Sequence, residues 1–295
     1  MEIRSNLGSK ILERLQEWED KERQLPGFIQ FYRELLKMQS EVECRATVRK
    51  PSLAPGVVRE RLSEGVPLLS FEDFQPDWQD VQKIFEQIAL WLVKDSGGPP
   101  DEAVALTNIS RNPYQLKAIL GDWYRGHSVA DIPGVDGIEP ELLTFVVATA
   151  LKPFLFAYSR HLLPEVDQEL WCRTYCPVCG GKPDFSYLDK ERGARWLLCS
   201  RCDAEWLFLR LACPCCGTQN QDALSYFTDE EDSSMYRLYV CEQCRTYIKT
   251  IDLRRAESAV LLPLERLMTL DMDRKAQDKG YKPGWSNPAV PVRVT

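Results

Sequence analysis

Four Cys-x-x-Cys pairs within residues 176–244 constrain this chain more than any other feature. They are Cys176/Cys179, Cys199/Cys202, Cys213/Cys216 and Cys241/Cys244. Two thiolates three residues apart can reach one tetrahedral metal ion from a tight turn, and two such turns complete a four-sulfur shell. A redox dithiol would explain one pair but not the recurrence of the spacing. The pairs therefore predict metal binding.

Segments 176–205 and 213–247 repeat one pattern. Each begins with Cys-Pro-x-Cys-Gly, passes through two apolar stretches and ends with its second pair; 19 residues separate the pairs in the first segment and 24 in the second. The first spacing is usual for a ribbon site and the second slightly longer. Gly180 and Gly217 follow the first turns, where φ > 0 is often needed. We assign site one to Cys176, Cys179, Cys199 and Cys202, and site two to Cys213, Cys216, Cys241 and Cys244.

A shell of four thiolates suits zinc and equally suits a single rubredoxin-like iron. It leaves no open coordination position, so neither site is expected to act as a hydrolytic or Lewis-acid centre. Structural zinc of this kind contributes ~10–16 kcal/mol of apparent folding free energy. The sequence therefore predicts two metal ions per chain that hold small hairpins together, with their identity open.

The rest of the chain shows helical periodicity of apolar residues. The pattern predicts amphipathic helices over residues 9–24, from Phe28, after Asp77 and after Asn112-Pro113. It predicts a loop with short helical pieces over 46–76. Glu139–Leu151 is apolar nearly all round and should continue, kinked at Pro153, toward Leu162. A last helix is expected over Ala259–Ala276, followed by an extended tail. The predicted domains are a helical bundle (1–165), two four-cysteine ribbons (166–212 and 213–256) and a C-terminal helix with the tail (257–295).

The N-terminal residues contain no apolar stretch typical of a secretory signal. The best candidate for a membrane span, Leu142–Ala157, is short and contains Lys152 and Pro153. We therefore expect a soluble cytoplasmic protein without membrane insertion. In a reducing compartment, clustered cysteines are more typical of metal sites than of disulfides.

The remaining candidates for chemistry are few. Cys44 is expected to be a buried small hydrophobe, while Cys172 and Cys215 could be ordinary turn residues, spare ligands or reactive thiols. His127 and His161 have no partner at metal or triad spacing. No phosphate loop, nucleophile elbow or zinc-hydrolase helix is present in the sequence. These observations predict no catalytic residues and no enzyme activity.

Tandem ribbons also raise the possibility of nucleic-acid binding. Binding to phosphates requires a clustered basic surface. Acidic residues slightly outnumber basic ones across 172–252, and four consecutive acidic residues, 229–232, mark the turn of the second hairpin. The charge pattern therefore disfavours a nucleic-acid partner.

Three stretches resemble the formate dehydrogenase accessory proteins, the FdhE family. They are Cys176-Pro-Val-Cys-Gly-Gly-Lys-Pro183, Leu198-Cys-Ser-Arg-Cys-Asp-Ala-Glu-Trp206 and Cys241-Glu-Gln-Cys-Arg-Thr-Tyr-Ile-Lys249. The resemblance implies a helical N-terminal domain with rubredoxin-like modules, iron at the metal sites, and a cytoplasmic maturation factor that binds the catalytic subunit of formate dehydrogenase. Asp203 and Arg245 stand where a true rubredoxin has glycine. This departure leaves zinc as an alternative to iron at the two sites.

The sequence thus favours a non-enzymatic maturation factor. The alternative is a rubredoxin-like electron-transfer protein, with a nucleic-acid-binding zinc-ribbon protein as the third hypothesis. Anchors for a protein partner could come from Trp196, Trp206, Tyr236 and Tyr239, although strand packing is expected to occupy at least half of them.

Overall fold

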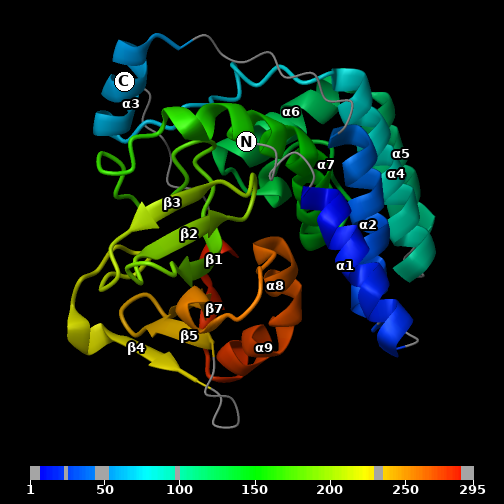
Figure 1. Ribbon diagram of the computed structural model, residues 1–295. Coiled ribbons are helices and arrows are strands. Elements are labelled where there is room, and N and C mark those ends of the chain that lie inside the picture. The colour runs from blue at the N-terminus through cyan, green and yellow to red at the C-terminus, as the bar shows by residue number, and fades with distance from the viewer. Residues whose placement is uncertain (1–6, 23–25, 44–52, 97–99, 229–234, 287–295) are drawn as a thin grey trace. The chain divides into compact units, whose positions relative to one another are not determined.

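A computed structural model describes residues 7–22, 26–43, 53–96, 100–228 and 235–286. These residues divide into two compact units. Unit 1 holds the described residues up to 51 and 70–158, and unit 2 holds those of 52–69 and 159–287. The fold is a set of helices plus a small sheet that carries two four-cysteine clusters (Figure 1), as the sequence predicts. The three boundaries between the four predicted domains stay a prediction.

Unit 1 is helical, and its helices follow the predicted apolar periodicity. Its elements are α1 (Leu7–Glu22), α2 (Gly27–Glu43), α4 (Trp78–Ser96), α5 (Pro100–Arg111), α6 (Pro113–Arg125) and most of α7 (Pro140–Leu162). Helix α5, in which Pro100 occupies the first helical position, is not among the helices predicted from the sequence.

Two predicted helix starts are confirmed. The Asp77 carboxylate accepts hydrogen bonds from the backbone N–H groups of Gln79 (2.9 Å) and Asp80 (3.4 Å) at the start of α4. The Asn112 side chain accepts from the N–H of Gln115 (3.2 Å), and Pro113 is the first helical residue of α6. Both caps satisfy N–H groups that a helix leaves without intrahelical partners.

Helix α7 is a core helix. By length and composition, Pro140–Glu165 is apolar enough to cross a membrane, but 61% of its most apolar window is buried. Leu143, Val146 and Val147 are buried, while Phe145 is 37% exposed. Burial of this extent is typical of the interior helix of a folded domain.

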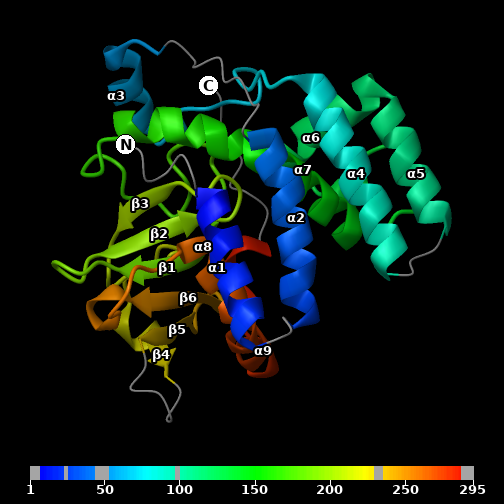
Figure 2. The ribbon, with the colours of Figure 1, turned by 45° about the vertical axis from the view of Figure 1, so that its right-hand side comes forward.

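Unit 2 is built on one sheet in the order β3-β2-β1-β6-β5-β4, with β7 paired to β6 (Figure 2). The strands are β1 (Pro183–Leu188), β2 (Arg195–Cys199), β3 (Glu205–Phe208), β4 (Leu224–Phe227), β5 (Tyr236–Cys241), β6 (Thr246–Asp252) and β7 (Lys282–Pro283). Each sequence repeat forms an antiparallel three-stranded meander, and the parallel pairing of β1 with β6 joins the two. The two ribbons therefore share one sheet.

The prediction of one C-terminal helix over Ala259–Ala276 is wrong in one respect, because the structure has two helices separated at Thr269. The structure has α8 (Leu262–Met268) and α9 (Leu270–Asp278). The buried Lys249 ammonium of β6 donates to the carbonyl oxygens of Arg266 (2.9 Å) and Thr269 (3.4 Å) at the break. Carbonyls at a helix end need such donors when they are buried. Helix α9 then packs on β5 and β6, with Ala276 beside Leu238 and Val240.

Part of the segment 46–76, which was expected to be mostly loop, belongs to unit 2, namely the described residues of 52–69. It contains α3 (Pro55–Glu64), and beyond that helix the backbone N–H groups of Leu68 and Leu69 donate to the carbonyls of Pro177 (2.8 Å) and Val178 (2.9 Å). A stretch distant in the sequence thus contacts the first cysteine turn.

Short 3-10 turns complete the elements at Val129–Asp131, Leu163–Glu165, Gln221–Ala223, Leu253–Arg255 and Gly284–Ser286.

Candidate metal centres

The structure brings together the four cysteines predicted for site one. The Sγ atoms of Cys176 and Cys202 lie 3.6 Å apart, those of Cys179 and Cys199 3.5 Å, and those of Cys179 and Cys202 3.4 Å. All four side chains are buried. Four sulfurs placed tetrahedrally at 2.3 Å from one ion are about 3.8 Å apart. The cluster therefore has nearly the dimensions of a closed four-thiolate shell.

The predicted site-two cysteines also gather. The Sγ atoms of Cys213 and Cys244 are 3.7 Å apart, and those of Cys216 and Cys241 are 3.9 Å apart. This cluster is more open than site one, because Cys216 is exposed and Cys244 is half-buried. The hydroxyl of Thr246 lies 2.9 Å from the Cys244 sulfur. The two clusters could thus hold two metal ions with different access from solvent.

The first turn of each site presents backbone N–H groups to sulfur. The N–H of Val178 donates to Cys176 Sγ (3.3 Å), and the N–H of Cys215 donates to Cys213 Sγ (3.4 Å). Gly180 has φ 72° and Gly217 has φ 77°, which confirms the left-handed turn predicted from the sequence. Such bonds favour the thiolate form that binds a metal ion.

The second turn of each site is unusual. Asp203 (φ 52°) and Arg245 (φ 55°) are the non-glycine residues with positive φ in the part of the chain that the structure describes. The left-handed conformation costs a residue with a Cβ roughly 1–2 kcal/mol. Both turns keep that backbone conformation without glycine, so side-chain contacts must offset its cost.

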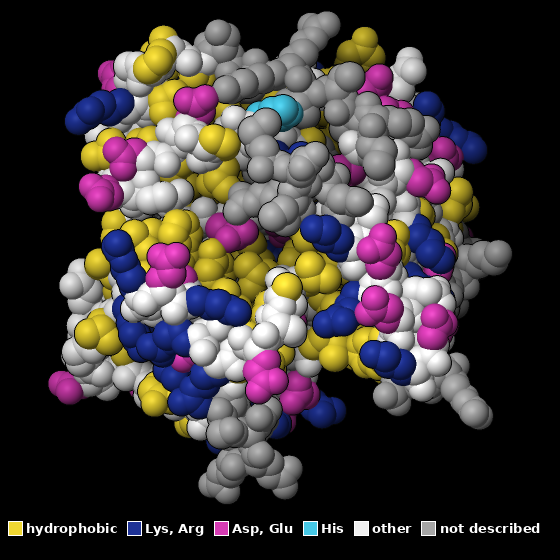
Figure 3. Space-filling model, viewed as in Figure 1, with side chains coloured by type: hydrophobic (Ala, Val, Ile, Leu, Met, Phe, Trp, Pro, Cys, Tyr) yellow, Lys and Arg dark blue, Asp and Glu magenta, His cyan; other side chains and the backbone are white. Residues whose placement is uncertain are grey.

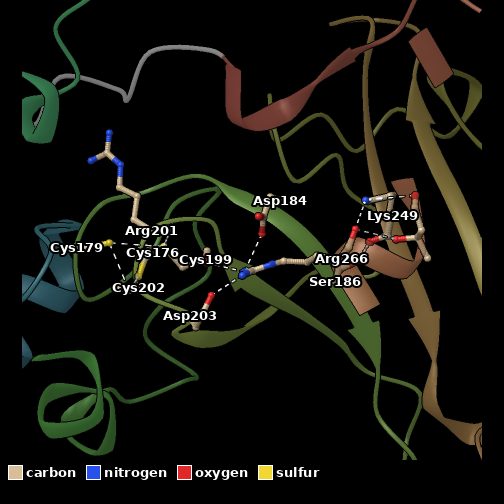
Figure 4. Close-up of polar contacts among 11 residues, drawn as sticks. Cys176, Cys179, Asp184, Ser186, Cys199, Arg201, Cys202, Asp203, Lys249 and Arg266 are labelled. Atoms are coloured by element: carbon tan, nitrogen blue, oxygen red, sulfur yellow. Dashed lines mark hydrogen bonds and ion pairs between the residues drawn. The ribbon is translucent and has the colours of Figure 1, made fainter. Parts of the chain in front are cut away.

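Arg266 of α8 supplies those contacts at site one (Figure 4). Its guanidinium donates to the Asp203 carboxylate and to the Cys199 carbonyl oxygen (2.7 Å), and it forms an ion pair with Asp184 (2.9 Å). The exposed fractions are 13% for the Arg266 side chain and 8% for Asp203. A largely buried arginine therefore ties the C-terminal helix to the second cysteine turn of site one.

Residues beyond α9 contact the corresponding turn of site two. The Arg245 guanidinium donates to the Lys279 carbonyl (3.1 Å) and pairs with Glu242, and its Cζ lies 4.2 Å from the Tyr281 ring centre. The Tyr281 hydroxyl donates to Glu242. Both sites are thus braced by the C-terminal segment, although the contacts at site two are more exposed.

The thiols of each cluster perturb one another. Burial raises the pKa of Cys176 and Cys202 well above the usual thiol value, while hydrogen bonds from neighbouring thiols lower the pKa of Cys179. In site two, the hydrogen bond between Cys213 and Cys244 raises the pKa of the first and lowers that of the second. Four thiolates so close need a cation, and a bound metal ion would displace the shared protons. The donor set fits either zinc or iron.

The other candidate residues are not members of the two four-cysteine groups, although a hydrogen bond from the Cys215 thiol helps to lower the pKa of Cys244 in site two. Cys172 is exposed, and Cys215 is half-buried with its Sγ 3.8 Å from the Gly284 carbonyl oxygen. Exposed His127 lies 3.1 Å from Asp122, and His161 is exposed. Cys44 and residues 229–232 are outside the described residues.

The four aromatic candidates for partner anchors divide as expected. Trp206 is buried and donates to the Arg173 carbonyl (2.9 Å), so it belongs to the core. Trp196 stacks on Tyr187, and the Tyr236 hydroxyl donates to Glu265. Tyr239 is half-buried beside Tyr226, with ring centres 5.4 Å apart.

Sequence reasoning missed the buried charged residues of unit 2, of which Arg266 contacts the second turn of site one. Arg266, Lys249 and Asp252 are mostly buried; Asp252 pairs with Arg237 (3.1 Å) and Arg254 (2.7 Å). Hydrogen bonds from Arg254 hold the pKa of Asp252 below its usual value. Lys249 and Asp252 interrupt an apolar strand, and this interruption was the sequence signal for buried charges. The sequence around Arg266 gave no such signal, because a charged residue is usual on an amphipathic helix.

The comparisons with known proteins agree with this architecture. The family model described as the FdhE central domain matches residues 175–210. The crystal structure of the FdhE protein from Pseudomonas aeruginosa matches 98% of this chain and 96% of its own, with a TM-score of 0.61 and 22% identity. At that identity the match speaks for the fold alone.

Two curated relatives extend the match beyond the cysteine region. An FdhE homolog of Stutzerimonas stutzeri is 32% identical over 199 residues, or 65% of this chain and 61% of the relative. An FdhE homolog of Aquifex aeolicus is 30% identical over 227 residues, or 76% of this chain and 74% of the relative. With that identity over most of both proteins, the chain belongs to the FdhE family.

Proposed function

We propose that this protein is a cytoplasmic, non-enzymatic accessory factor that binds the catalytic subunit of formate dehydrogenase and assists its maturation. Membership of the FdhE family carries the proposal. The two four-cysteine clusters support a role without catalysis, because a shell of four thiolates leaves no position for a substrate.

The clusters would hold one metal ion each through Cys176, Cys179, Cys199 and Cys202, and through Cys213, Cys216, Cys241 and Cys244. Iron is favoured by the family resemblance, and zinc satisfies the same donor set. In either case the bound ion fixes the turns at both ends of each hairpin. The protein's own contribution is a rigid sheet on which a partner can dock.

The proposal is tested in a host from which the gene is deleted. Formate dehydrogenase activity should fall and return on complementation with the wild-type gene, and the tagged protein should capture the catalytic subunit from that host. The purified protein alone should not oxidise formate. Full formate dehydrogenase activity in the deletion strain would contradict the proposal, and so would failure of the purified proteins to form a complex.

Electron transfer is the second candidate function, and the openness of site two favours it. Because the Cys216 residue is exposed, an iron bound at site two would lie closer to a redox partner than one at the fully buried site one. Visible absorption from thiolate-to-iron charge transfer, bleached reversibly by a reductant, would support this alternative. A colourless protein that contains two zinc ions would exclude it.

A further inference from the structure

Unit 2 contains a pocket of about 310 Å³ beside the second cluster. Its lining includes three arginines, Arg195, Arg210 and Arg237, and the rings of Tyr226 and Tyr239. None of the described residues that line it is acidic. Figure 3 shows Lys and Arg side chains gathered at the lower left, where Figure 1 places strands of the sheet. The pocket therefore combines positive charge with aromatic surface.

The pocket opens on the face of the sheet opposite to α9. Arg237 and Tyr239 alternate along β5 with Leu238 and Val240, and successive side chains of a strand point to opposite faces. Leu238 and Val240 pack with Ala276 of α9. The C-terminal helix accordingly leaves Arg237 and Tyr239 accessible to a ligand.

Arg195 is the most deeply buried of the three arginines that line this pocket. It is 2% exposed, its Nη1 donates to the Ala212 carbonyl (3.1 Å), and its Cζ lies 4.3 Å from the centre of the Tyr239 ring. Its Nε and Nη2 atoms are buried and have no hydrogen-bond partner among the described residues. These two nitrogens form one edge of the guanidinium, so one complete bidentate donor pair is unsatisfied.

An unsatisfied buried cation needs an explanation. Burial lowers the pKa of Arg195, because desolvation disfavours its charged form. Tyr239 and, to a smaller extent, Cys213 offset part of this cost, because both act to raise the pKa of Arg195. Through-space attraction does not, however, provide acceptors for the two N–H groups. A ligand oxygen pair would do so once the side chain turns this edge, which is buried in the structure, toward the pocket.

The neighbouring arginines are placed differently. Arg237 pairs with Asp252 (3.1 Å), which it shares with Arg254, and donates to the Tyr239 hydroxyl (3.4 Å), so its guanidinium already has hydrogen-bond partners. Arg210 is exposed and adds positive potential. Leu211 and Tyr226, which are 64% and 53% exposed, offer apolar surface in the same lining. This combination suits a ligand with an anionic end and an apolar body.

We propose that this pocket binds a small organic carboxylate, whose two oxygens accept hydrogen bonds from Nε and Nη2 of Arg195 and whose apolar part contacts Tyr226 and Leu211. A planar carboxylate matches the planar guanidinium edge, whereas a lysine ammonium would offer only a point charge. The inference goes beyond the proposed accessory function and does not depend on it.

Isothermal titration of the metal-loaded, full-length protein with benzoate tests the proposal. Benzoate should bind with one-to-one stoichiometry and a dissociation constant on the order of 1 mM or lower, as expected for a fragment of its size. Benzamide, which has a similar shape but no charge, should bind at least about tenfold more weakly. Benzoate titration should also shift the NMR signal of the Arg195 Nε–H.

Substitutions identify the site. Arg195→Lys retains the charge but removes the bidentate edge, so benzoate affinity should fall at least about tenfold. Leu211→Glu, at an exposed position that should not affect folding, should also weaken benzoate binding. Arg192→Lys, an exposed arginine outside the lining, is the matched control and should bind like wild type. Circular dichroism and metal content establish that each variant is folded.

Four outcomes would overturn the proposal. The first is the absence of saturable benzoate binding to the wild-type protein, and the second is equal binding of benzamide. The third is an Nε–H signal of Arg195 that benzoate leaves unchanged, which remains decisive if Arg195→Lys does not fold. Inorganic phosphate binding in place of benzoate would reject the carboxylate assignment in favour of a tetrahedral oxyanion.

Discussion

Replacing Arg266 with methionine tests whether the C-terminal helix stabilises the first metal site. The substitution keeps much of the side-chain volume and removes the charge. It leaves the Asp203 carboxylate, 8% exposed, without its main cation and removes a hydrogen bond to the Cys199 carbonyl oxygen. Asp184, 18% exposed, also loses an ion-pair partner.

The magnitude follows from the burial of these groups. Removing one member of a buried ion pair typically costs 3–5 kcal/mol, because the remaining charge is left without a partner. The Arg266 side chain keeps 13% of its surface exposed, so the lower limit of about 3 kcal/mol applies. That free energy corresponds to roughly a 100-fold change in the unfolding equilibrium of unit 2. Metal release from site one should accelerate, since the turn at Asp203 loses its support.

Urea unfolding at neutral pH, followed by circular dichroism and metal release, measures the effect. The transition of unit 2 is the one that coincides with metal release. The control is Lys275→Met on α9, whose pair with Asp271 is 3.7 Å long and about half exposed, so the loss should be below about 1 kcal/mol. A double-mutant cycle with Asp203→Asn should give a coupling of about 1 kcal/mol or more. If Arg266→Met cost no more than Lys275→Met, the bracing role of α8 would be refuted.

Three further predictions concern the metal sites and the charges behind them. A chelator should remove metal in two phases, and Cys216→Ser should abolish the fast phase while Cys199→Ser abolishes the slow one, because site two is the more exposed; a single phase in the wild-type protein would contradict this order. Asp203→Gly should destabilise unit 2 in urea, because it removes the buried ion pair between Asp203 and Arg266. Arg245→Gly should be nearly neutral, because glycine adopts the positive φ without strain and the lost contacts of Arg245 are exposed. Equal destabilisation by the two substitutions would argue against a difference between the turns. The pKa of Asp252 is lower in the folded protein than its ordinary value of 3.8, so its contribution to stability is complete above 3.8 and is lost as the pH falls through the folded pKa. The difference in unfolding free energy between wild type and Asp252→Asn should therefore be constant from about pH 8 to pH 5 and shrink only below about pH 4. A difference that already shrinks near neutral pH would contradict the assignment.

The sequence determined the features that depend on local chemistry. The spacing of the cysteine pairs and the internal repeat predicted which four sulfurs meet, since both turns of a site belong to one hairpin module. Gly180 and Gly217 predicted left-handed turns, because the backbone conformation at a tight turn depends on the local residues. The caps at Asp77 and Asn112 followed from helix ends that need side-chain acceptors.

Tertiary structure decided the features that join distant segments. The parallel pairing of β1 with β6 merges the two repeats into one sheet, and nothing in the spacing of either repeat specifies that pairing. Arg266 and the acceptors it contacts at Asp203 and Cys199 are more than 60 residues apart. Arg195 and Tyr239 likewise come from different ribbons. Such contacts are fixed by the packing of whole elements, because no local periodicity encodes which buried charge will find which partner.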